Sequence, residues 1–331
     1  MSGVWTVAEI SGGEIKAISF ELLTAARQLA DTLGTTVGSV VIGHEAASVA
    51  GSLFACGADE VAVAESPALA NFAPEAWTKV IASFAAEHHP QVILLGHSAL
   101  GKDLAGRLAV RLGTSVIADC THFAVAGGKV VCTRPIFGGT MLSSAVGTTA
   151  LTFATVRPKA FARPNEQPGR EGKLLRIAVD ESWARSRTET LEITREQTAA
   201  IGLADAEIVV SGGRGVGTPD KFELIERLAA QLGAAVGASR AVVDAGWRPH
   251  KEQVGQTGRT VSPKLYVACG ISGAIQQLVG MRTSGTIVAI NTDAEAPIMK
   301  VANVAVVGDL QEVIPAVIEE LKKRAGAPQG V

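Results

Sequence analysis

Short apolar runs that end in a glycine turn and lead into a helical pattern recur along this chain of 331 residues. The clearest is VACGISGAIQQLVG at residues 267–280, which has the pattern of a buried strand, a glycine turn and the opening of a helix. Repetition of this unit predicts an α/β fold with a largely parallel sheet. At this length, and with 47% hydrophobic residues, the chain can form two domains of ordinary size.

The first half of the chain predicts an N-terminal α/β domain with the rhythm of nucleotide-binding folds. Apolar runs at 4–10, 37–43, 60–66 and 92–97 predict strands. We expect a first helix that Ser19 caps and Gly34 ends, a second that opens at Pro74, and a third over about residues 100–112. The runs at 129–139 and 147–158 predict a pair of longer antiparallel strands.

The weakest periodicity lies between residues 158 and 206, where prolines and charges interrupt short apolar runs. We therefore expect an N-terminal domain at 1–204, with a linker from about residue 158, and a C-terminal domain at 205–331. Five apolar runs in the second domain predict a doubly wound parallel sheet, with strands at 208–212, 234–239, 265–270, 286–291 and 304–309. One helix is expected to be capped by Thr218, opened by Pro219 and ended by Gly233, and the last helix covers about 310–324.

Composition excludes several classes of function. A net charge of -2 without a basic run argues against nucleic acid as the main partner. The four cysteines are scattered, with no CxxC pair and no histidine cluster, so neither a disulfide framework nor a metal site is indicated. No apolar run approaches the ~20 residues that span a bilayer, and no leader pattern is seen. We expect a bacterial cytoplasmic protein that does not insert into a membrane.

The turns of the second domain carry the features of a ligand site. Backbone N–H groups at glycine turns attract phosphate oxygens, and Arg214, inside SGGRGVG, adds a fixed cation. Arg240 directly follows a predicted strand, and the polar stretch at 253–258 is rich in donors that suit a flat heteroaromatic ring. The alternative for the glycine turns is an ordinary strand–helix connection. The alternative for Arg240 and the polar stretch is a solvated surface loop.

Four motifs in order carry a resemblance: SGGRGVG, VGASRAVVDAGW, QVGQTGRTVSPKLYVACGISGAIQ and INTDAEAP. They closely resemble the FAD-binding domain of the electron transfer flavoprotein alpha (large) subunit, over about residues 208–317. The first half resembles the same family more loosely, in LLGHSALGKDLAGRLAVRLG. The resemblance implies an electron carrier with no substrate turnover of its own. It also implies a beta subunit as heterodimer partner, acyl-CoA or related dehydrogenases as electron donors, as in fatty acid oxidation, and a membrane quinone reductase or another acceptor.

The resemblance also implies which residues lie near FAD. Arg214, Ser239 and the turn from Ser272 are expected at the pyrophosphate and ribityl chain. Arg240 and residues 254–257 are expected around the isoalloxazine, with the Thr257 hydroxyl near N5, and Asn291 and Asp309 at the adenosine end. The full expected set is Arg214, Ser239, Arg240, Gln253, Val254, Gly255, Gln256, Thr257, Gly270, Ser272, Gly273, Ala274, Ile275, Gln276, Gln277, Asn291 and Asp309.

One position departs from the family pattern. Family members commonly read GAIQH where this chain reads GAIQQ, so Gln277 stands where a histidine is expected near the flavin O2. A glutamine amide donates a neutral hydrogen bond, whereas histidine can donate as a cation. We expect the reduced flavin to be stabilised less here than in a histidine-bearing relative.

Other interpretations stay open at this point. A non-redox interaction subunit could keep the fold without the cofactor. A self-contained NAD-type dehydrogenase requires an acidic residue at the end of the second strand, where this chain reads GASR. His97 could belong to a nucleotide-hydrolase loop, but a helix cap by Ser98 is the simpler expectation. The sequence does not name the donor, the acceptor or the pathway, nor does it tell whether the beta subunit carries AMP or a second FAD.

Overall fold

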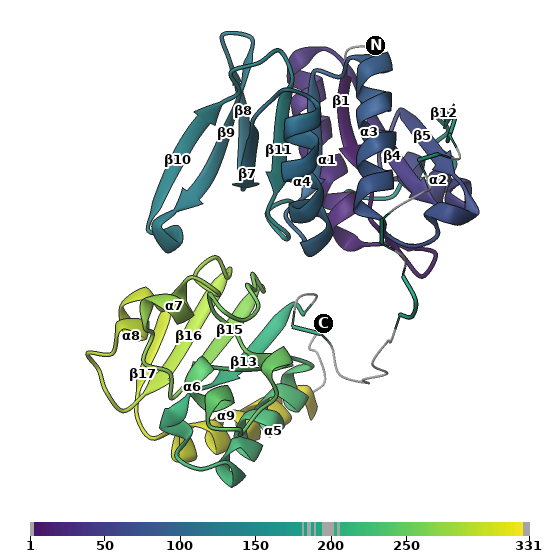
Figure 1. The fold of residues 1–331 in the computed structure, drawn as a ribbon. Coiled ribbons are helices and arrows are strands. Elements are labelled where there is room, and N and C mark those ends of the chain that lie inside the picture. Colours follow the sequence, from purple (N-terminus) through teal and green to yellow (C-terminus); the bar gives the residue numbers. More distant parts are fainter. Residues whose placement is uncertain are drawn as a thin grey trace. The chain divides into compact units, whose positions relative to one another are not determined.

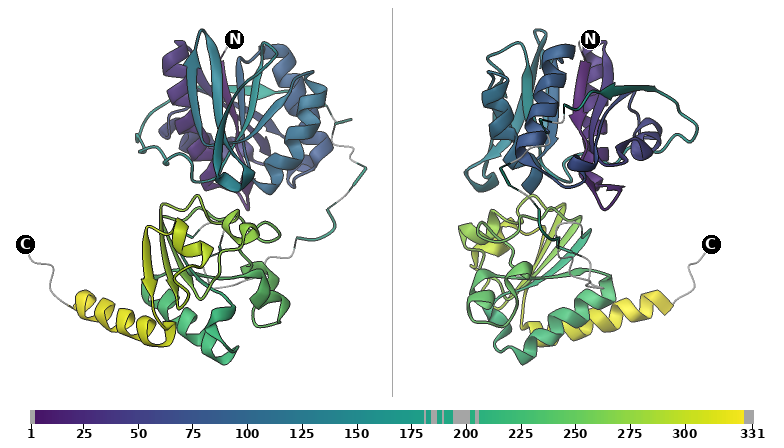
Figure 2. Two further views of the ribbon diagram at one scale, coloured as in Figure 1. Left: turned by 90° about the vertical axis from the view of Figure 1, so that its left-hand side faces the viewer. Right: turned by 45° about the vertical axis from the view of Figure 1, so that its right-hand side comes forward.

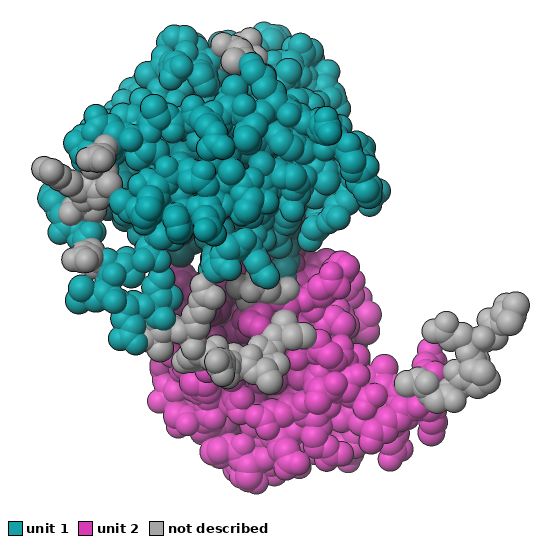
Figure 3. Space-filling view, turned by 90° about the vertical axis from the view of Figure 1, so that its right-hand side faces the viewer, with its two compact units in different colours: residues 1–136, 141–194 teal, residues 137–140, 195–331 magenta. Residues whose placement is uncertain are grey.

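The computed structural model describes residues 3–180, 182–183, 187–188, 190–193, 202–203 and 206–326. The chain divides into two compact units, residues 1–136 with 141–194 and residues 137–140 with 195–331, which Figure 3 shows in separate colours. The predicted boundary between residues 204 and 205 lies outside the described residues.

A seven-stranded parallel sheet forms the centre of the first unit (Figure 1). Its central strands are largely apolar runs, because helices cover both faces and leave little room for polar residues. In spatial order they are β12 (Lys173–Ile177), β5 (Glu60–Glu65), β4 (Thr36–Gly43), β1 (Gly3–Val7), β6 (Val92–Gly96), β11 (Thr152–Val156) and β7 (Val116–Cys120). A topological switch point lies between β1 and β6. From β1 the chain adds β4 and β5 on one side, and β6 begins the other side.

Two hydrophobic clusters line the two faces of this sheet. Helices α1 (Ala17–Leu33) and α2 (Ala50–Ala55) bury apolar residues in one cluster, and α3 (Pro74–His88) and α4 (Ala99–Arg111) in the other. Gly34 ends α1 in the left-handed conformation and Pro74 opens α3, as predicted. The Ser19 prediction is wrong: α1 begins at Ala17, and the buried Ser19 hydroxyl instead accepts from the Glu9 N–H at 2.8 Å.

The antiparallel strands of this unit differ in part from the prediction. A three-stranded antiparallel sheet contains β8 (His122–Ala126), β9 (Lys129–Ile136) and β10 (Met141–Val146), so the strand expected at 129–139 is confirmed. Its expected partner at 147–158 is wrong, because β11 lies there, buried and parallel between β6 and β7. The expected linker from about residue 158 is also corrected, since β12 extends the main sheet beside β5.

The second unit is built on a five-stranded parallel sheet, and Figure 2 shows it from two further sides. Its spatial order is β14 (Ala235–Ala238), β13 (Ile208–Gly212), β15 (Leu265–Cys269), β16 (Thr286–Asn291) and β17 (Val304–Val307), so all five predicted strands are confirmed. One face packs against α7 (Ile275–Leu278) and α8 (Pro297–Val301), the other against α5 (Glu223–Leu232), α6 (Arg240–Asp244) and α9 (Leu310–Gly326).

The start of α5 corrects one more expectation. The helix expected to be capped by Thr218 begins at Glu223, after a 3₁₀ turn at Asp220–Phe222, and ends at Gly233 as predicted. The remaining short elements are the hairpin β2 (Ile10–Ser11) and β3 (Glu14–Ile15) and the 3₁₀ turns Ala46–Val49, Pro67–Leu69, Phe137–Gly139, Arg214–Val216 and His250–Glu252. Among the described residues, no helix has the length and apolar character to cross a bilayer.

Candidate cofactor site

The strand order of the second unit fixes where a ligand can bind. Counted along the chain, the order is 2-1-3-4-5, so the winding direction reverses between β13 and β15. Ligands of such sheets bind outside the carboxyl ends of the strands at this switch point. The chain carries a glycine turn after each of the two strands, and the turns are joined by backbone hydrogen bonds: Gly213 N–H donates to Cys269 O and Gly215 N–H to Gly270 O, both at 2.9 Å.

The two turns approach each other too closely for side chains. A Cβ atom on Gly213 would lie 2.2 Å from the Gly270 carbonyl oxygen. Gly270 itself has φ +60°, and Gly273 has φ +83° with the Ile298 backbone nitrogen 2.4 Å from the place of a Cβ. Only glycine satisfies both the backbone conformation and the contact. The result is a cradle of bare backbone at the switch point.

Two further contacts hold the second turn in place. Ile298 N–H donates to the Ser272 carbonyl at 3.1 Å, and the Asn291 side-chain amide donates to Ile271 O at 2.9 Å. Ser272 and Ala274 are exposed, and Ile275, the first residue of α7, is 74% exposed. Ser272, Ala274 and Ile275 are therefore accessible at this turn, while the Asn291 amide supports it.

The polar loop at residues 253–258 lies against α7. Gln256 N–H donates to Gln276 O at 2.8 Å, and a Cβ on Gly280 would lie 2.4 Å from the Gly255 nitrogen. The Gln253 side chain is buried inside the loop, where its Nε2 donates to the Thr257 hydroxyl at 2.9 Å. The loop ends at residue 258 and α7 begins at Ile275, and these contacts join the two into one continuous surface. Gln256 and Thr257 are exposed on it, whereas Val254 is fully buried in the core.

The predicted charged residues lie at three strand ends of the same sheet. Arg214 is exposed in the turn after β13. Arg240 opens α6 directly after Ser239, whose N–H donates to Gly212 O at 3.0 Å, and its Nε lies 3.2 Å from Asp244 Oδ2. Asp309 is exposed after β17, and its carboxylate accepts from Gln311 N–H at the start of α9. All three side chains reach solvent on this edge of the sheet.

Gln277 has a partner that sequence reasoning did not find. It is 7% exposed, and its Nε2 donates to the hydroxyl of Tyr266 at 3.2 Å. Burial raises the pKa of Tyr266, although hydrogen bonding from neighbouring groups acts in the opposite direction, so the phenol stays neutral. Burial likewise raises the pKa of the neighbouring Cys269 thiol to about 12. The signal that could have pointed to Tyr266 is its being the only tyrosine in the chain, within an otherwise apolar strand.

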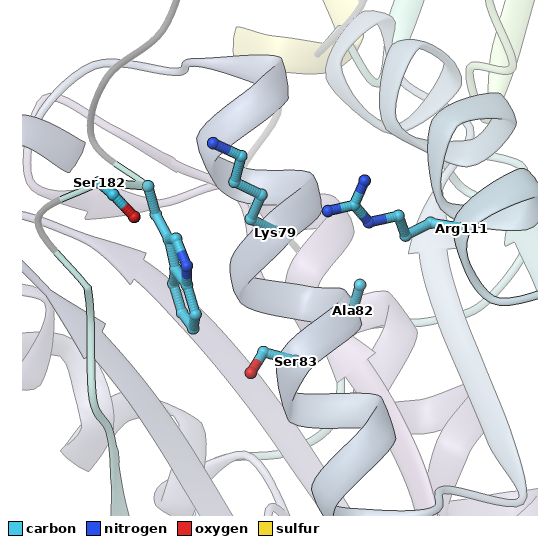
Figure 4. Close-up of a pocket in the computed structure, with 6 residues that line it drawn as sticks. Lys79, Ala82, Ser83, Arg111 and Ser182 are labelled. Carbon is cyan, nitrogen blue, oxygen red and sulfur yellow. The ribbon is translucent and has the colours of Figure 1, made fainter.

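The described residues of the first unit offer weaker candidates. A pocket of about 490 Å³ lies between α3, α4 and residues 182–183, with Lys79 and Arg111 on its wall (Figure 4). No residue predicted from the sequence lines it. No group of histidine, cysteine or acidic side chains among the described residues has the arrangement of a metal site.

At the switch point of the first unit, side chains at or just after the ends of neighbouring strands are bonded to one another. Ser98 caps α4 as expected, accepting from Gly101 N–H at 3.0 Å, and its hydroxyl donates to the buried Glu9 carboxylate at 2.5 Å. Burial raises the pKa of Glu9, partly offset by this bond. His97 Nδ1 lies 2.9 Å from the Thr155 hydroxyl. These bonds fit helix-cap and turn chemistry.

A doubly wound sheet whose glycine turns are joined at the switch point, beside a polar loop bonded to a neighbouring helix, defines a nucleotide-binding domain. The family model of the electron transfer flavoprotein domain matches residues 4–182, and that of the electron transfer flavoprotein FAD-binding domain matches residues 202–282. The chain belongs to the electron transfer flavoprotein alpha subunit family.

Full-length relatives support this assignment. The chain is 46% identical to the electron transfer flavoprotein subunit alpha of Thermoanaerobacterium thermosaccharolyticum, covering 97% of this chain and 98% of the relative. It is 41% identical to that of Bacillus subtilis, with 97% of both chains covered. Protein FixB of Rhizobium meliloti is 40% identical over 97% of this chain and 93% of its own length. The protein is therefore an FAD-binding electron carrier rather than an enzyme with substrate turnover, as the sequence predicted.

The described residues fit FAD. Glycine at 213, 270 and 273 lets the two turns pack against each other and against α8, and it leaves bare backbone that a phosphate group can approach closely. Ser272, Gln256 and Thr257 are exposed, and their hydroxyl and amide groups are available as neutral hydrogen-bond donors. Bound FAD supplies the one- and two-electron chemistry, and the protein supplies binding, orientation and charge.

Proposed function

We propose that this chain forms a heterodimer with an electron transfer flavoprotein beta subunit and carries electrons from acyl-CoA or related dehydrogenases to a quinone reductase or another acceptor. The observation that supports it most directly is the pair of joined glycine turns at the switch point, in a chain that its alpha-subunit relatives match almost end to end. A carrier must exchange electrons with large partners, so the cofactor edge has to reach the surface. The exposed loop and the exposed Ile275 beside the cradle suit that requirement.

The proposed roles follow the positions along the sheet edge. Arg214, Ser239, Gly270, Gly273 and the exposed turn from Ser272 surround the pyrophosphate and ribityl chain. Arg214 supplies a cation and the hydroxyls of Ser239 and Ser272 supply neutral donors. The N–H groups of Ser239 and Gly270 hold the turns in place by donating to Gly212 O and Ile290 O. The adenosine end is assigned to Asp309 and Asn291. The latter acts through the turn that its amide supports.

At the ring end, the proposed surround is the loop and α7. Arg240 lies over or beside the isoalloxazine, and the Thr257 hydroxyl lies near N5. Gln253 acts from inside the loop by holding Thr257, and the buried Val254 anchors the loop to the core. The remaining members of the proposed ring-end set are Gly255, Gln256, Ala274, Ile275, Gln276 and Gln277.

The positive charge of Arg240 favours reduction of a flavin bound at this site. A guanidinium cannot lose its proton at physiological pH, so it favours the form of the cofactor that carries added negative charge. Its pairing with Asp244 is between exposed groups, whose attraction water weakens. Arg240 is therefore free to turn toward a bound ring, and it eases electron acceptance there.

Co-expression with a beta subunit tests the proposal. The chain should be flavin-depleted or poorly soluble by itself and should hold one FAD per heterodimer when the beta subunit is present. FAD released by heat and identified by its spectrum gives the stoichiometry. A colourless heterodimer would support the non-redox interaction subunit, and a monodisperse monomer with full FAD would contradict the need for a partner.

A cytoplasmic location is part of the proposal, supported by four free buried cysteines.

A further inference from the structure

Three polar side chains lie buried on the face of the second sheet that α7 covers. They are Gln277 on α7, Tyr266 on β15 and Ser211 on β13, with exposed fractions of 7%, 0% and 0%. The amide Nε2 of Gln277 donates to the Tyr266 hydroxyl at 3.2 Å. The Ser211 hydroxyl lies beside that of Tyr266, short of hydrogen-bond geometry, and is without a hydrogen-bond partner among the described residues. Tyr266 thus has both of the other polar groups as neighbours on this buried face.

Buried polar side chains of this kind destabilise a core whose only task is packing. A buried polar group without a partner destabilises a protein by about 1–3 kcal/mol, and apolar side chains of the same shape avoid that cost. The surrounding cluster is otherwise made of residues such as Val209, Leu278 and Met281. A buried tyrosine joined to a buried glutamine on the helix that follows the second glycine turn therefore calls for a role other than packing.

The hydrogen-bonding capacity of the groups suggests that role. The amide of Gln277 has two N–H donors and one carbonyl oxygen, so the bond to Tyr266 leaves a second donor on the same nitrogen. The backbone of α7 is already fixed, since Gln256 N–H binds Gln276 O and Gln277 N–H binds Ala274 O, both at 2.8 Å. What remains to be set is the side-chain conformation of Gln277, and the Tyr266 hydroxyl sets it.

We propose that Tyr266 is a positioning residue of the flavin site, whose hydroxyl holds the Gln277 amide so that its second N–H faces the pyrimidine end of FAD. The inference rests on the proposed function, in which Gln277 lies beside the ring. The neutral phenol accepts from the amide through its oxygen. Tyr266 therefore affects the cofactor only through Gln277.

Removing the hydroxyl should change the cofactor's preference between redox states. In Tyr266→Phe the ring still fills the core, but the amide loses its fixed orientation. Reduction adds negative charge at the pyrimidine end, so a donor that is no longer held there stabilises reduced FAD less. We expect the preference for one-electron-reduced over oxidised FAD to fall about threefold, which is roughly 30 mV at 59 mV per tenfold.

A double-mutant cycle tests this coupling. Wild type, Tyr266→Phe, Gln277→Met and the double variant are compared as FAD-loaded heterodimers by spectroelectrochemistry. The expected result is a lower first potential for Tyr266→Phe in the wild-type background and no change from the same substitution in the Gln277→Met background. Equal changes in both backgrounds, or none in either, overturn the inference while leaving the proposed function intact. Absence of bound FAD from the wild-type heterodimer overturns both.

A second measurement does not depend on a tyrosine variant that folds. The chain has one tyrosine, so [ζ-¹³C]tyrosine incorporated into this chain alone gives a single NMR signal after assembly with an unlabelled beta subunit. Full reduction of the bound FAD should shift this signal in the wild type and leave it in place in Gln277→Met. A signal that stays fixed in the wild type, or that shifts equally in both proteins, contradicts the coupling through Gln277.

Discussion

The backbone N–H of Gln256 lies 2.8 Å from the carbonyl oxygen of Gln276, and this bond joins the polar loop at residues 253–258 to helix α7. Val254 N–H in turn donates to Ala238 O at the end of β14, which joins the loop to the sheet. The loop is therefore held from two sides, and its exposed residues keep a fixed relation to the glycine turns. Preorganisation of this kind lowers the entropy lost when a cofactor binds.

Arg240→Ala should lower the first reduction potential of bound FAD. The substitution removes a cation that cannot titrate away, so the reduced flavin loses a favourable neighbour. A tenfold loss of stabilisation corresponds to about 59 mV for a one-electron step, and we expect a decrease of some tens of millivolts. Spectroelectrochemistry of the FAD-loaded heterodimer measures it. Asp244→Asn is the matched control, because it removes the ion-pair partner and leaves the cation; its potential should not fall.

Gly213→Ala should abolish tight FAD binding. The added methyl group would collide with the Gly270 carbonyl oxygen and push apart the two turns that form the cradle. We expect at least a roughly tenfold loss of FAD affinity, together with a loss of about 1–3 kcal/mol in the free energy of unfolding. Isothermal titration of the deflavinated heterodimer with FAD gives the affinity.

Gly106→Ala serves as the control for that experiment. Gly106 lies in α4, and its Cβ position is open. Alanine there should raise the free energy of unfolding by about 0.5–1 kcal/mol and leave FAD affinity unchanged. Equal FAD affinity for Gly213→Ala and Gly106→Ala would show that the cradle is not the phosphate site.

Gln277→His should raise the first reduction potential by some tens of millivolts. A charged donor exceeds a neutral one by about 1 kcal/mol, and the imidazolium would offset negative charge at N1 and O2 of the ring. The gain should disappear as pH rises through the histidine's pKa, because neutral imidazole has lost the charge. Potentiometric titration at several pH values checks this. Identical potentials and pH slopes for both proteins would exclude Gln277 from redox tuning.

Asp59→Asn should destabilise the first unit at neutral pH. Burial acts to raise the pKa of Asp59, but hydrogen bonds from Val37 N–H, Arg27 and Arg170 outweigh it and lower the pKa. Because the folded-state pKa lies below the unfolded one, the stabilisation is present above the unfolded pKa and is lost as pH falls through the folded value. At pH 7 we expect the variant to lose about 2 kcal/mol of unfolding free energy.

Urea unfolding at pH 7 and at successively lower pH measures that loss. The buried Trp5 and Trp77 of the same unit provide the fluorescence signal. Asp31→Asn is the matched control, because Asp31 also pairs with Arg27, at 3.5 Å, but is mostly exposed; its effect should stay below about 0.5 kcal/mol. A deficit in Asp59→Asn that persisted at the lowest pH would point to packing instead of charge.

The sheet of the second unit could be predicted from sequence because buried parallel strands require apolar runs and leave little else to interpret. The error at β11 has a physical cause. The run at 147–158 begins with a glycine and two threonines, which suit a hairpin, and only its neighbours β6 and β7 decide that both of its faces are buried. Ser19 failed as a cap for a similar reason, since Glu9, which its hydroxyl binds, comes from a different element.

The candidate site was predictable as a set of residues but not as a set of contacts. Glycine spacing and the family motifs identified the turns, the loop and α7. The side-chain orientation of Gln277 could not be read from helical spacing, because a four-residue helix presents no full periodic face. The Tyr266 hydroxyl reaches it across the sheet face, and Asn291 supports the second turn. Both contacts depend on which strands are neighbours in the folded sheet.

Strand β12 determines where the first unit can be cut from the rest of the chain. It pairs in register with β5, from Lys173 beside Glu60 to Ile177 beside Ala64. A fragment that stopped near residue 158 would leave β5 with a row of open backbone donors and acceptors, the kind of edge that recruits strands from other molecules. A fragment that continues past Ile177 keeps that edge covered. The residues between 158 and 177 therefore decide whether this unit, expressed by itself, exposes an edge that promotes aggregation.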